Sequence, residues 1–422
     1  MAEITRSIHF PVCSRSACRQ IRVLLSVMLI ICAGCAPFRK PFTKYNSLEK
    51  MNISEFPQFH DALDLTGLEH AIGQSLLYFN KIHKTRVFNF GKDRFDANHM
   101  KNSLKKFLLF IQHHPSKKEL NRFIRNNYAV YRSVGKSGHS EMLFTGYYEP
   151  TLKGSLTRDD DYVYPLYSKP ADLVSIDLSL FSKRFSNSHI LMARVNKNKQ
   201  VVPYFSRQEI NSINDFKKRA MPIAWLKNPI DRFFLEIQGS GKILLKQGGF
   251  LRVHYLASNG RRYRSIGRYL IAKKEITKEN MSMQSIRRWL DNHPDRMEEV
   301  FNYNPSFVFF KKETGGPFGC LGVAITPIRS IATDRSLFPE GALCFIKTRV
   351  PLKTPDPKNP DTENQAMENW SAYSGFVLNQ DTGGAIRGPG RADLFYGNGR
   401  YARFAAGHMN HRGKLYFLVL KK

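Results

Sequence analysis

Two aspartates near the C-terminus, Asp381 and Asp393, stand twelve residues apart with glycines between them, and a third, Asp334, precedes them. Glycines at this density permit tight turns and close approach of a ligand. Asp381 precedes Thr-Gly-Gly, so its carboxylate can simply accept hydrogen bonds from turn amides. Asp393 is followed by Leu394 and Phe395 in a strand-like segment. A carboxyl held against apolar surface is suited to general acid catalysis, and we expect Asp393 to be such a group.

Other chemistries find little support in the sequence. There is no CxxC and no HExxH, so neither a structural nor a catalytic zinc site is indicated, and no cofactor is expected. No finger, basic zipper or aromatic RNA-binding motif is present, so nucleic acid is not an expected partner. Cys320 and Cys344 could form a disulfide in an oxidising compartment or remain two small buried residues.

The composition is that of a globular protein with an unusual charge. Of 422 residues, 42% are hydrophobic, which argues against disorder, and no long apolar run recurs, which excludes a polytopic membrane protein. Lys and Arg number 65 against 35 Asp and Glu, a net charge of +30. Such a chain attracts polyanions, including nucleic acid, anionic lipid and acidic polymers. A general basic bias of the source proteome is the alternative explanation.

The N-terminus reads as an export signal. Basic residues precede the apolar run Val23–Ile31, and small residues follow it up to Cys35. Ala33-Gly34-Cys35 is similar to a bacterial lipobox, which predicts acylation of Cys35, although Cys32 stands where such boxes usually carry Leu, Val or Ile. Residues 1–35 are therefore predicted to be a lipoprotein signal peptide, and the polar residues 36–60 a tether. Simple cleavage or an uncleaved anchor are the alternatives.

These acidic residues must be positioned by the elements around them. Residues 96–130 predict two helices, the first with Leu104, Phe107, Leu108 and Ile111 on one face, the second opened by a Ser116/Glu119 capping box. Further helices are expected at 278–291 and 295–302. Strands are expected, from aromatic and β-branched content, at 142–148, 162–164, 200–202, 233–237, 252–255, 306–311, 321–326, 342–350, 371–379, 392–395 and 414–421. The residues alone thus indicate a β-rich α+β protein.

One segment departs from this pattern. Residues 350–370 contain a run rich in proline, which predicts a surface extension rather than core.

Several motifs together are similar to those of a known family. The three segments that contain the aspartates resemble a 3D (three-aspartate) domain: Ser330–Ser336, Asp381–Gly388 and Arg391–Phe395. The rest resembles the membrane-bound lytic murein transglycosylase A family through six segments in order: Phe144–Pro150, Ile237–Gly241, Tyr263–Gly267, Met281–Ile286, Asn304–Phe310 and Ala406–Gly413. The resemblance covers about 140 to 422, and the region 60–135 matches only loosely.

The resemblance implies a fold that is mainly β (α+β). A double-psi β-barrel domain carries a second β-rich domain as an insertion, with a sugar groove between them. The implied domains are a helical N-terminal part and first barrel strand over 61–150, an inserted domain over 151–305, and a C-terminal barrel half over 306–422.

The resemblance also implies an activity. The family cleaves the β-1,4 bond between N-acetylmuramic acid and N-acetylglucosamine in peptidoglycan without water, leaving 1,6-anhydromuramic acid ends. Its acid/base matches Asp393, and Asp381 matches a supporting acid. Thr145 and Gln238, Gly239, Ser240 and Gly241 match groove residues that contact sugar.

Further roles and partners complete this expectation. Tyr147, Tyr148, Phe395 and Tyr396 are candidates to stack on sugar faces, and Asp334 is expected to be a structural acid. Expected partners are peptidoglycan glycan strands, the outer membrane through the lipid anchor, and other cell-wall enzymes, with the protein facing the periplasm of a Gram-negative cell.

Three alternatives remain at this point. A water-using muramidase would employ Asp381 as a second carboxylate. A non-catalytic peptidoglycan-binding lipoprotein would use the acids structurally. A protein that binds polyanions through charge alone would lose binding steeply with salt.

Overall fold

The computed structural model describes residues 46–135, 140–185, 190–351 and 369–422. Residues Phe42–Lys422 form one compact unit, distinct from Met1–Pro41. The expected signal peptide, Cys35 and residues 352–368 of the proline-rich segment lie outside the described residues. No helix among the described residues is long and apolar enough to cross a bilayer.

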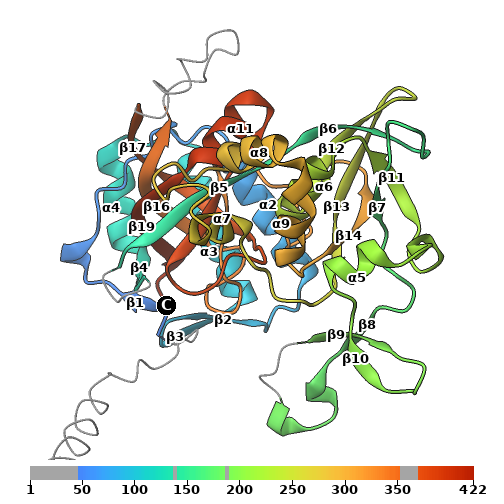
Figure 1. Cartoon of the computed structure of the whole chain (residues 1–422). Helices are drawn as coiled ribbons and strands as arrows, with labels where there is room; N and C mark the ends of the chain where they lie inside the picture. The colour runs from blue at the N-terminus through green and yellow to red at the C-terminus, as the bar shows by residue number, and fades with distance from the viewer. Residues whose placement is uncertain (1–45, 136–139, 186–189, 352–368) are drawn as a thin grey trace, which may run out of the picture. The chain divides into compact units, whose positions relative to one another are not determined.

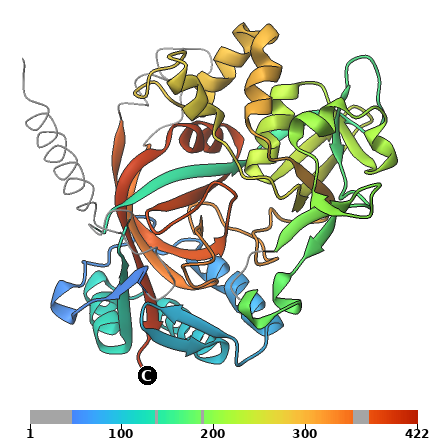
Figure 2. The same cartoon turned by 60° about the horizontal axis from the view of Figure 1, so that its bottom comes forward.

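A closed β-barrel forms the first part of the fold. Its strands follow the order β19-β16-β17-β15-β18-β5, and β5 pairs again with β19, so six strands close on themselves; β4 and β1 extend the sheet beyond β19. The pairs β15–β17 and β18–β5 are parallel. Figure 2 looks into this barrel, with the teal β5 crossing beside orange and red strands. The strands are β1 (Leu48–Lys50), β4 (Tyr128–Ser133), β5 (Met142–Glu149), β15 (Ser330–Ala332), β16 (Leu343–Pro351), β17 (Trp370–Asp381), β18 (Arg391–Asn398) and β19 (Asn410–Leu420).

A second sheet is formed by residues that lie between β5 and β15 in sequence. Its order is β14-β13-β12-β6-β11-β7, and Figure 1 shows it beside the barrel. The strand expected at 306–311 belongs to this sheet, because it pairs with β13 rather than with a barrel strand. The strands are β6 (Thr151–Ser155), β7 (Tyr164–Tyr167), β11 (Pro222–Leu226), β12 (Ser240–Leu245), β13 (Phe250–Ser258) and β14 (Val308–Glu313). A smaller sheet contains β8 (Val174–Ile176), β9 (Leu191–Val195) and β10 (Val201–Pro203), and a hairpin contains β2 (Val87–Phe90) and β3 (Asp93–Asp96).

Helices pack on both parts. The two helices predicted at 96–130 are confirmed as α3 and α4, including the capping box in which Ser116 and Glu119 bond reciprocally. Leu104, Phe107 and Ile111 are buried against the barrel. The helices are α2 (Leu68–Lys81), α3 (Ala97–Ile111), α4 (Lys117–Asn127), α5 (Arg207–Ser212), α6 (Pro229–Gln238), α7 (Ile266–Ala272), α8 (Met283–Asn292), α9 (Met297–Tyr303) and α11 (Gly399–His408).

Two strand predictions are wrong. Residues 233–237 belong to helix α6, because Asn228 caps its first amides, Pro229 occupies the first turn and Gly239, with φ +79°, ends it. Residues 321–326 form no strand; a single bridge joins Phe318 to Ala324 there. The apolar content of both segments reflects burial rather than strand geometry.

The expected tether is shorter than 36–60. Residues 48–50 form β1, which pairs with β4, and Phe56 and Phe59 are buried in the barrel core. Aromatic side chains so placed fix the backbone, so only residues before β1 can serve as a linker.

A buried ion pair holds the start of β15. Both terminal nitrogens of Arg329 donate to the Asp61 carboxylate, at 2.6 and 2.8 Å, and its Nε donates to the Thr66 carbonyl. Asp61 also accepts the amide of Phe376 in β17. Burial would raise the pKa of Asp61, but the Arg329 guanidinium and the amide donors outweigh it and lower that pKa.

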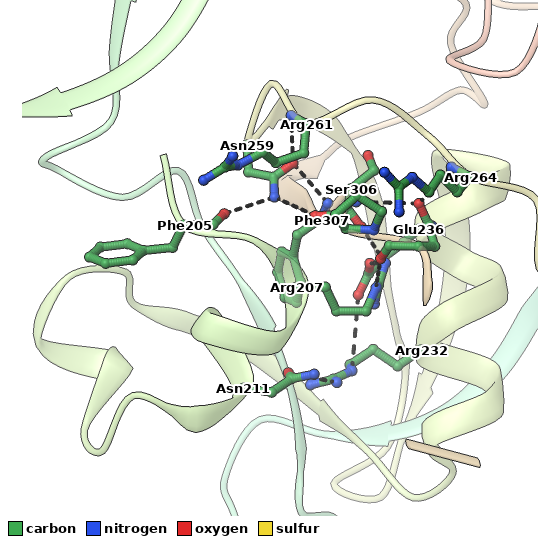
Figure 3. Close-up of polar contacts among 12 residues, drawn as sticks. Phe205, Arg207, Asn211, Arg232, Glu236, Asn259, Arg261, Arg264, Ser306 and Phe307 are labelled. Atoms are coloured by element: carbon green, nitrogen blue, oxygen red, sulfur yellow. Dashed lines mark hydrogen bonds and ion pairs between the residues drawn. The ribbon is translucent and has the colours of Figure 1, made fainter. Parts of the chain in front are cut away.

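A second buried ion pair holds helix α6. Arg207 donates to Glu236 at 2.5 Å and to the carbonyls of Asn304 and Ser306. Figure 3 shows this guanidinium enclosed by the turn before β14 and by α6. Because both partners are buried, the pair fixes α6 against the second sheet, just before Gln238.

We predict that Arg329→Gln lowers the free energy of unfolding by about 3–5 kcal/mol, because it leaves the buried Asp61 carboxylate unpaired. Urea unfolding at pH 7 measures this. Arg412→Gln is the matched control, since the Arg412–Glu141 pair is exposed and its loss should cost about 1 kcal/mol or less. Equal effects of the two substitutions would contradict the prediction.

Candidate active site

Residues from four neighbouring barrel strands lie side by side in one row across the sheet. Asp393 in β18 is the register partner of Thr145 in β5 and of Ala332 in β15, and Ala332 is in turn the partner of Asp381 in β17. Register partners point to the same face, and neighbouring strands lie about 4.8 Å apart. The two aspartates therefore flank one small side chain, and the barrel brings together three residues that the sequence separates widely.

Asp393 has one oxygen engaged by polar neighbours. Thr145 Oγ1 and Arg391 Nε both donate to Oδ1, the second at 3.2 Å, and Arg391 Nη2 donates to Thr145 Oγ1 at 3.1 Å. No hydrogen bond from a described residue reaches Oδ2, and the side chain is 13% exposed. The surroundings of Asp393 include a charged side chain that the sequence analysis did not expect, because Arg391, two residues earlier in the strand, lies on the same face.

Asp381 has both oxygens engaged. Oδ1 accepts the amides of Cys320 and Thr382, at 2.9 and 2.8 Å, and Oδ2 accepts the Tyr147 hydroxyl at 2.9 Å. Burial raises the pKa of Asp381 to about 6; these donors oppose the shift, and the charge of Asp393 adds to it. Asp381 therefore changes charge close to neutral pH.

Asp334 lies apart from this pair and holds a loop. Its Oδ1 accepts the amide and hydroxyl of Ser336, and its Oδ2 accepts the Gly388 amide at 2.8 Å. The carboxylate is buried and joins the turn after β15 to the glycine-rich loop between the two other acids. These hydrogen bonds hold the two loops in place.

The segment Gln238–Gly241 lies at the end of β5. Gln238 accepts the Tyr148 amide at 3.1 Å, and Gly239 accepts the amide of Tyr255. A Cβ on Gly241 would lie 2.5 Å from the tip of the Leu235 side chain, so a larger residue there would force this buried side chain of α6 to move. Tyr148 is three residues beyond Thr145, about 10 Å along the strand. The segment therefore borders the row of acids without touching it.

Only one of the four candidate aromatic rings is partly exposed. Tyr148, Phe395 and Tyr396 are buried, so they cannot present a face to sugar. Tyr147 is partly exposed, packs on Phe395 with ring centres 5.1 Å apart and donates to Asp381.

Two groups that hydrogen-bond to the aspartates were not predicted from the sequence. Arg391 stands two residues before Asp393, a spacing that in a strand places both side chains on one face and was a readable signal. The Cys320 amide, which holds Asp381, gave no signal, because a backbone donor can come from any residue type. Cys320 is exposed, Cys344 is buried, and both thiols are free. Among the described residues no cluster of His, Cys, Asp and Glu could hold a metal ion.

Comparisons with known proteins agree on one family. Residues 143–311 match the MltA specific insert domain and residues 329–419 match the 3D domain. Membrane-bound lytic murein transglycosylase A of Escherichia coli K12 is 31% identical over 294 residues, 68% of each chain. The Vibrio cholerae enzyme of the same name is 30% identical over 292 residues, again 68% of each chain.

A solved structure shows the same fold. The crystal structure of a membrane-bound lytic murein transglycosylase from Agrobacterium tumefaciens matches 89% of this chain and 98% of its own, at 26% identity and a TM-score of 0.70. The barrel with an inserted β-rich part is thus shared with a protein of that name.

We predict that Asp381 contributes stability near pH 4 that is lost as the pH rises to about 6, a slope opposite to that of carboxyls with lowered pKa values, such as Asp61. Its pKa is raised from 3.8 to about 6, so the folded chain binds the proton more tightly than the unfolded chain in that window. In Asp381→Asn this contribution to the slope disappears. Urea midpoints at several pH values measure the slope, with the exposed Asp291→Asn as control; parallel slopes in all three proteins would contradict the prediction.

Proposed function

The chain belongs to the membrane-bound lytic murein transglycosylase A family, and from that premise we propose how its residues cleave peptidoglycan. The reaction breaks the β-1,4 bond between N-acetylmuramic acid and N-acetylglucosamine without water and forms 1,6-anhydromuramic acid ends. The observation that carries the mechanism is the asymmetric carboxyl of Asp393, with Oδ1 held by Thr145 and Arg391 and Oδ2 free of hydrogen bonds from the described residues.

In this mechanism a single carboxyl acts twice. Asp393 Oδ2 gives its proton to the glycosidic oxygen while the bond from C1 to that oxygen breaks, and N-acetylglucosamine leaves with a 4-hydroxyl. The carboxylate then takes the proton of the muramoyl 6-hydroxyl as O6 bonds to C1. The proton count closes and no water is consumed. An intramolecular hydroxyl has a high effective molarity, so a second activating carboxylate is unnecessary.

The neighbours of Asp393 assist this exchange. Arg391 stabilises the carboxylate that exists between the two proton transfers, and Thr145 fixes the plane of the carboxyl group. Asp381 supports the site through Tyr147 and places a second acidic group close to the positive charge that develops at C1.

A water-using muramidase is less well supported. Its second carboxylate would have to orient and deprotonate a water, and Asp381 would be that group. Both oxygens of Asp381 already accept hydrogen bonds, three in all, which leaves little capacity to hold a nucleophilic water.

Substrate contacts are proposed along β5, on one side of the acids. Thr145, Tyr147 and the segment Gln238–Gly241 are assigned to the sugar groove, since they line one side of β5 from the acids to its end. The E. coli MltA structure with bound chitohexaose shares the fold, at 24% identity over 91% of this chain and 97% of that one, with a TM-score of 0.65. The two sheets support a division into a barrel domain and an inserted domain, with the insertion extended beyond the expected 151–305 to the end of β14 at Glu313.

We assign the protein to the periplasmic face of the outer membrane. Residues 1–34 would be removed by cleavage before Cys35, and Cys35 would carry the acyl chains; related proteins are named membrane-bound. Peptidoglycan strands are the substrate, and other cell-wall enzymes are candidate partners in the same compartment.

We predict that Asp393→Asn abolishes release of anhydro-muropeptides from purified peptidoglycan but keeps peptidoglycan binding, because the amide cannot donate and recover the proton. Mass spectrometry of soluble products measures this, with the exposed Asp291→Asn as an active control. Reducing ends in the parent's products would identify a muramidase. Release by Asp393→Asn at the parent's rate would remove Asp393 from the mechanism.

We predict that Arg391→Gln lowers kcat about tenfold to a hundredfold with little change in KM, whereas Arg391→Lys recovers part of the loss. Lysine keeps the charge but not the paired geometry that reaches both Asp393 and Thr145. Initial rates of muropeptide release across pH test this. A change confined to KM, or equal losses in both variants together with lower thermal stability, would assign Arg391 a structural role only.

A further inference from the structure

The small sheet β8-β9-β10 carries a face made only of apolar residues. Register pairs Ala193 with Val174 and Pro203, Leu191 with Ile176, and Val195 with Val201. Partners point to one face, as do alternate residues in a strand. The face therefore consists of Val174, Ile176, Leu191, Ala193, Val195, Val201 and Pro203, called the apolar face below.

Most of this face is open to solvent. Leu191, Val195 and Val201 are 49%, 58% and 59% exposed, and Leu180 and Phe181, in the connection between β8 and β9, are 83% and 75% exposed. The opposite face packs inward: Met192 lies against Gly260, and the Arg194 guanidinium stacks on Phe205. The sheet thus packs on the protein through its opposite face, and of the apolar face only the small Ala193 is buried, outside the core clusters of the described residues.

Two lysines border the apolar face at one end, within a segment that is basic overall. Residues 169–203 contain six Lys or Arg and two Asp. Lys197 and Lys199 lie exposed in the turn between β9 and β10, while Asp172 is engaged by Arg219 and Tyr204. Exposed apolar side chains next to basic residues are typical of surfaces that enter the headgroup region of an anionic bilayer.

The length of chain between Cys35 and the first described residue is compatible with membrane contact at this face. Cys35 precedes Asn46, the first described residue, by eleven residues, a span of at most roughly 40 Å. In Figure 1, β1 and the sheet β8–β10 both lie toward the lower side of the molecule. A bilayer that holds an acylated Cys35 is therefore within reach of that side.

We propose that the apolar face of β8–β10, with Leu180 and Phe181, inserts into the interface of a bilayer that contains anionic phospholipid. It provides a second attachment besides the acyl chain, and it orients the enzyme on the membrane. The proposal rests on the proposed anchor for proximity to lipid, but its chemistry is independent of the cleavage reaction.

The test uses residues 42–422, which form one compact unit, so that no acyl chain contributes. Sedimentation with vesicles of phosphatidylethanolamine and phosphatidylglycerol is compared with phosphatidylcholine vesicles. We expect binding to the anionic vesicles, weakened at least about tenfold by Leu191→Ser, Val195→Ser and Val201→Ser together. Lys197→Gln with Lys199→Gln should weaken it about threefold to tenfold and reduce its salt dependence.

Matched controls separate lipid from other causes. Leu77→Ser, Leu109→Ser and Leu244→Ser remove three apolar side chains that are also exposed, and should leave vesicle binding unchanged. Equal binding by the apolar-face variant and the parent, or no binding by the parent, overturns the proposal. Loss of self-association in the apolar-face variant, without loss of lipid binding, would assign the face to a protein contact instead. Muropeptide release in solution is measured on the same samples, so failure of the catalytic proposal shows separately.

Discussion

The geometry of the acidic site depends on a strand of three residues. β15 lies between β17 and β18, and its last residue, Ala332, is the register partner of both Asp381 and Asp393. So short a strand has few backbone hydrogen bonds of its own. Its position is fixed by Arg329, whose guanidinium is bound by Asp61 and by the Thr66 and Phe376 carbonyls. A buried charge outside the site therefore sets the separation of the two carboxyls.

The site also depends on contacts between distant parts of the chain. Thr145 and Asp393 are 248 residues apart, and their strands pair in parallel across a long connection that contains the second sheet. Helix α6, held by the Arg207–Glu236 pair, brings Gln238 to the amide of Tyr148. Gly146 allows α11 to cross β5, since a Cβ there would lie 2.7 Å from Ala406. Long-range packing thus assembles what the local sequence cannot.

Sequence patterns predicted those elements whose formation depends on interactions within a few residues. The capping box at Ser116 and the long C-terminal strands were readable, because caps and strand composition act over a few residues. β15 was missed, since three residues give no periodicity. Helix α6 was taken for a strand because its buried positions are continuously apolar, although Asn228-Pro229 carried a helix-start signal. The acids were found by motif, but the Cys320 amide that holds Asp381 depends on tertiary structure alone.

The carboxyl groups of Asp381 and Asp393 differ in which of their oxygens are free of hydrogen bonds from neighbouring described residues. Asp381 accepts three hydrogen bonds that engage both of its oxygens and fix its orientation, and burial raises its pKa to about 6. Asp393 is held through one oxygen by a threonine and an arginine, and its other oxygen is left to the substrate. A group that must give and then recover a proton needs a fixed plane and one free atom. Only the second carboxyl meets both conditions, and this asymmetry, rather than the number of acids, supports the proposal that one aspartate serves as acid and then as base.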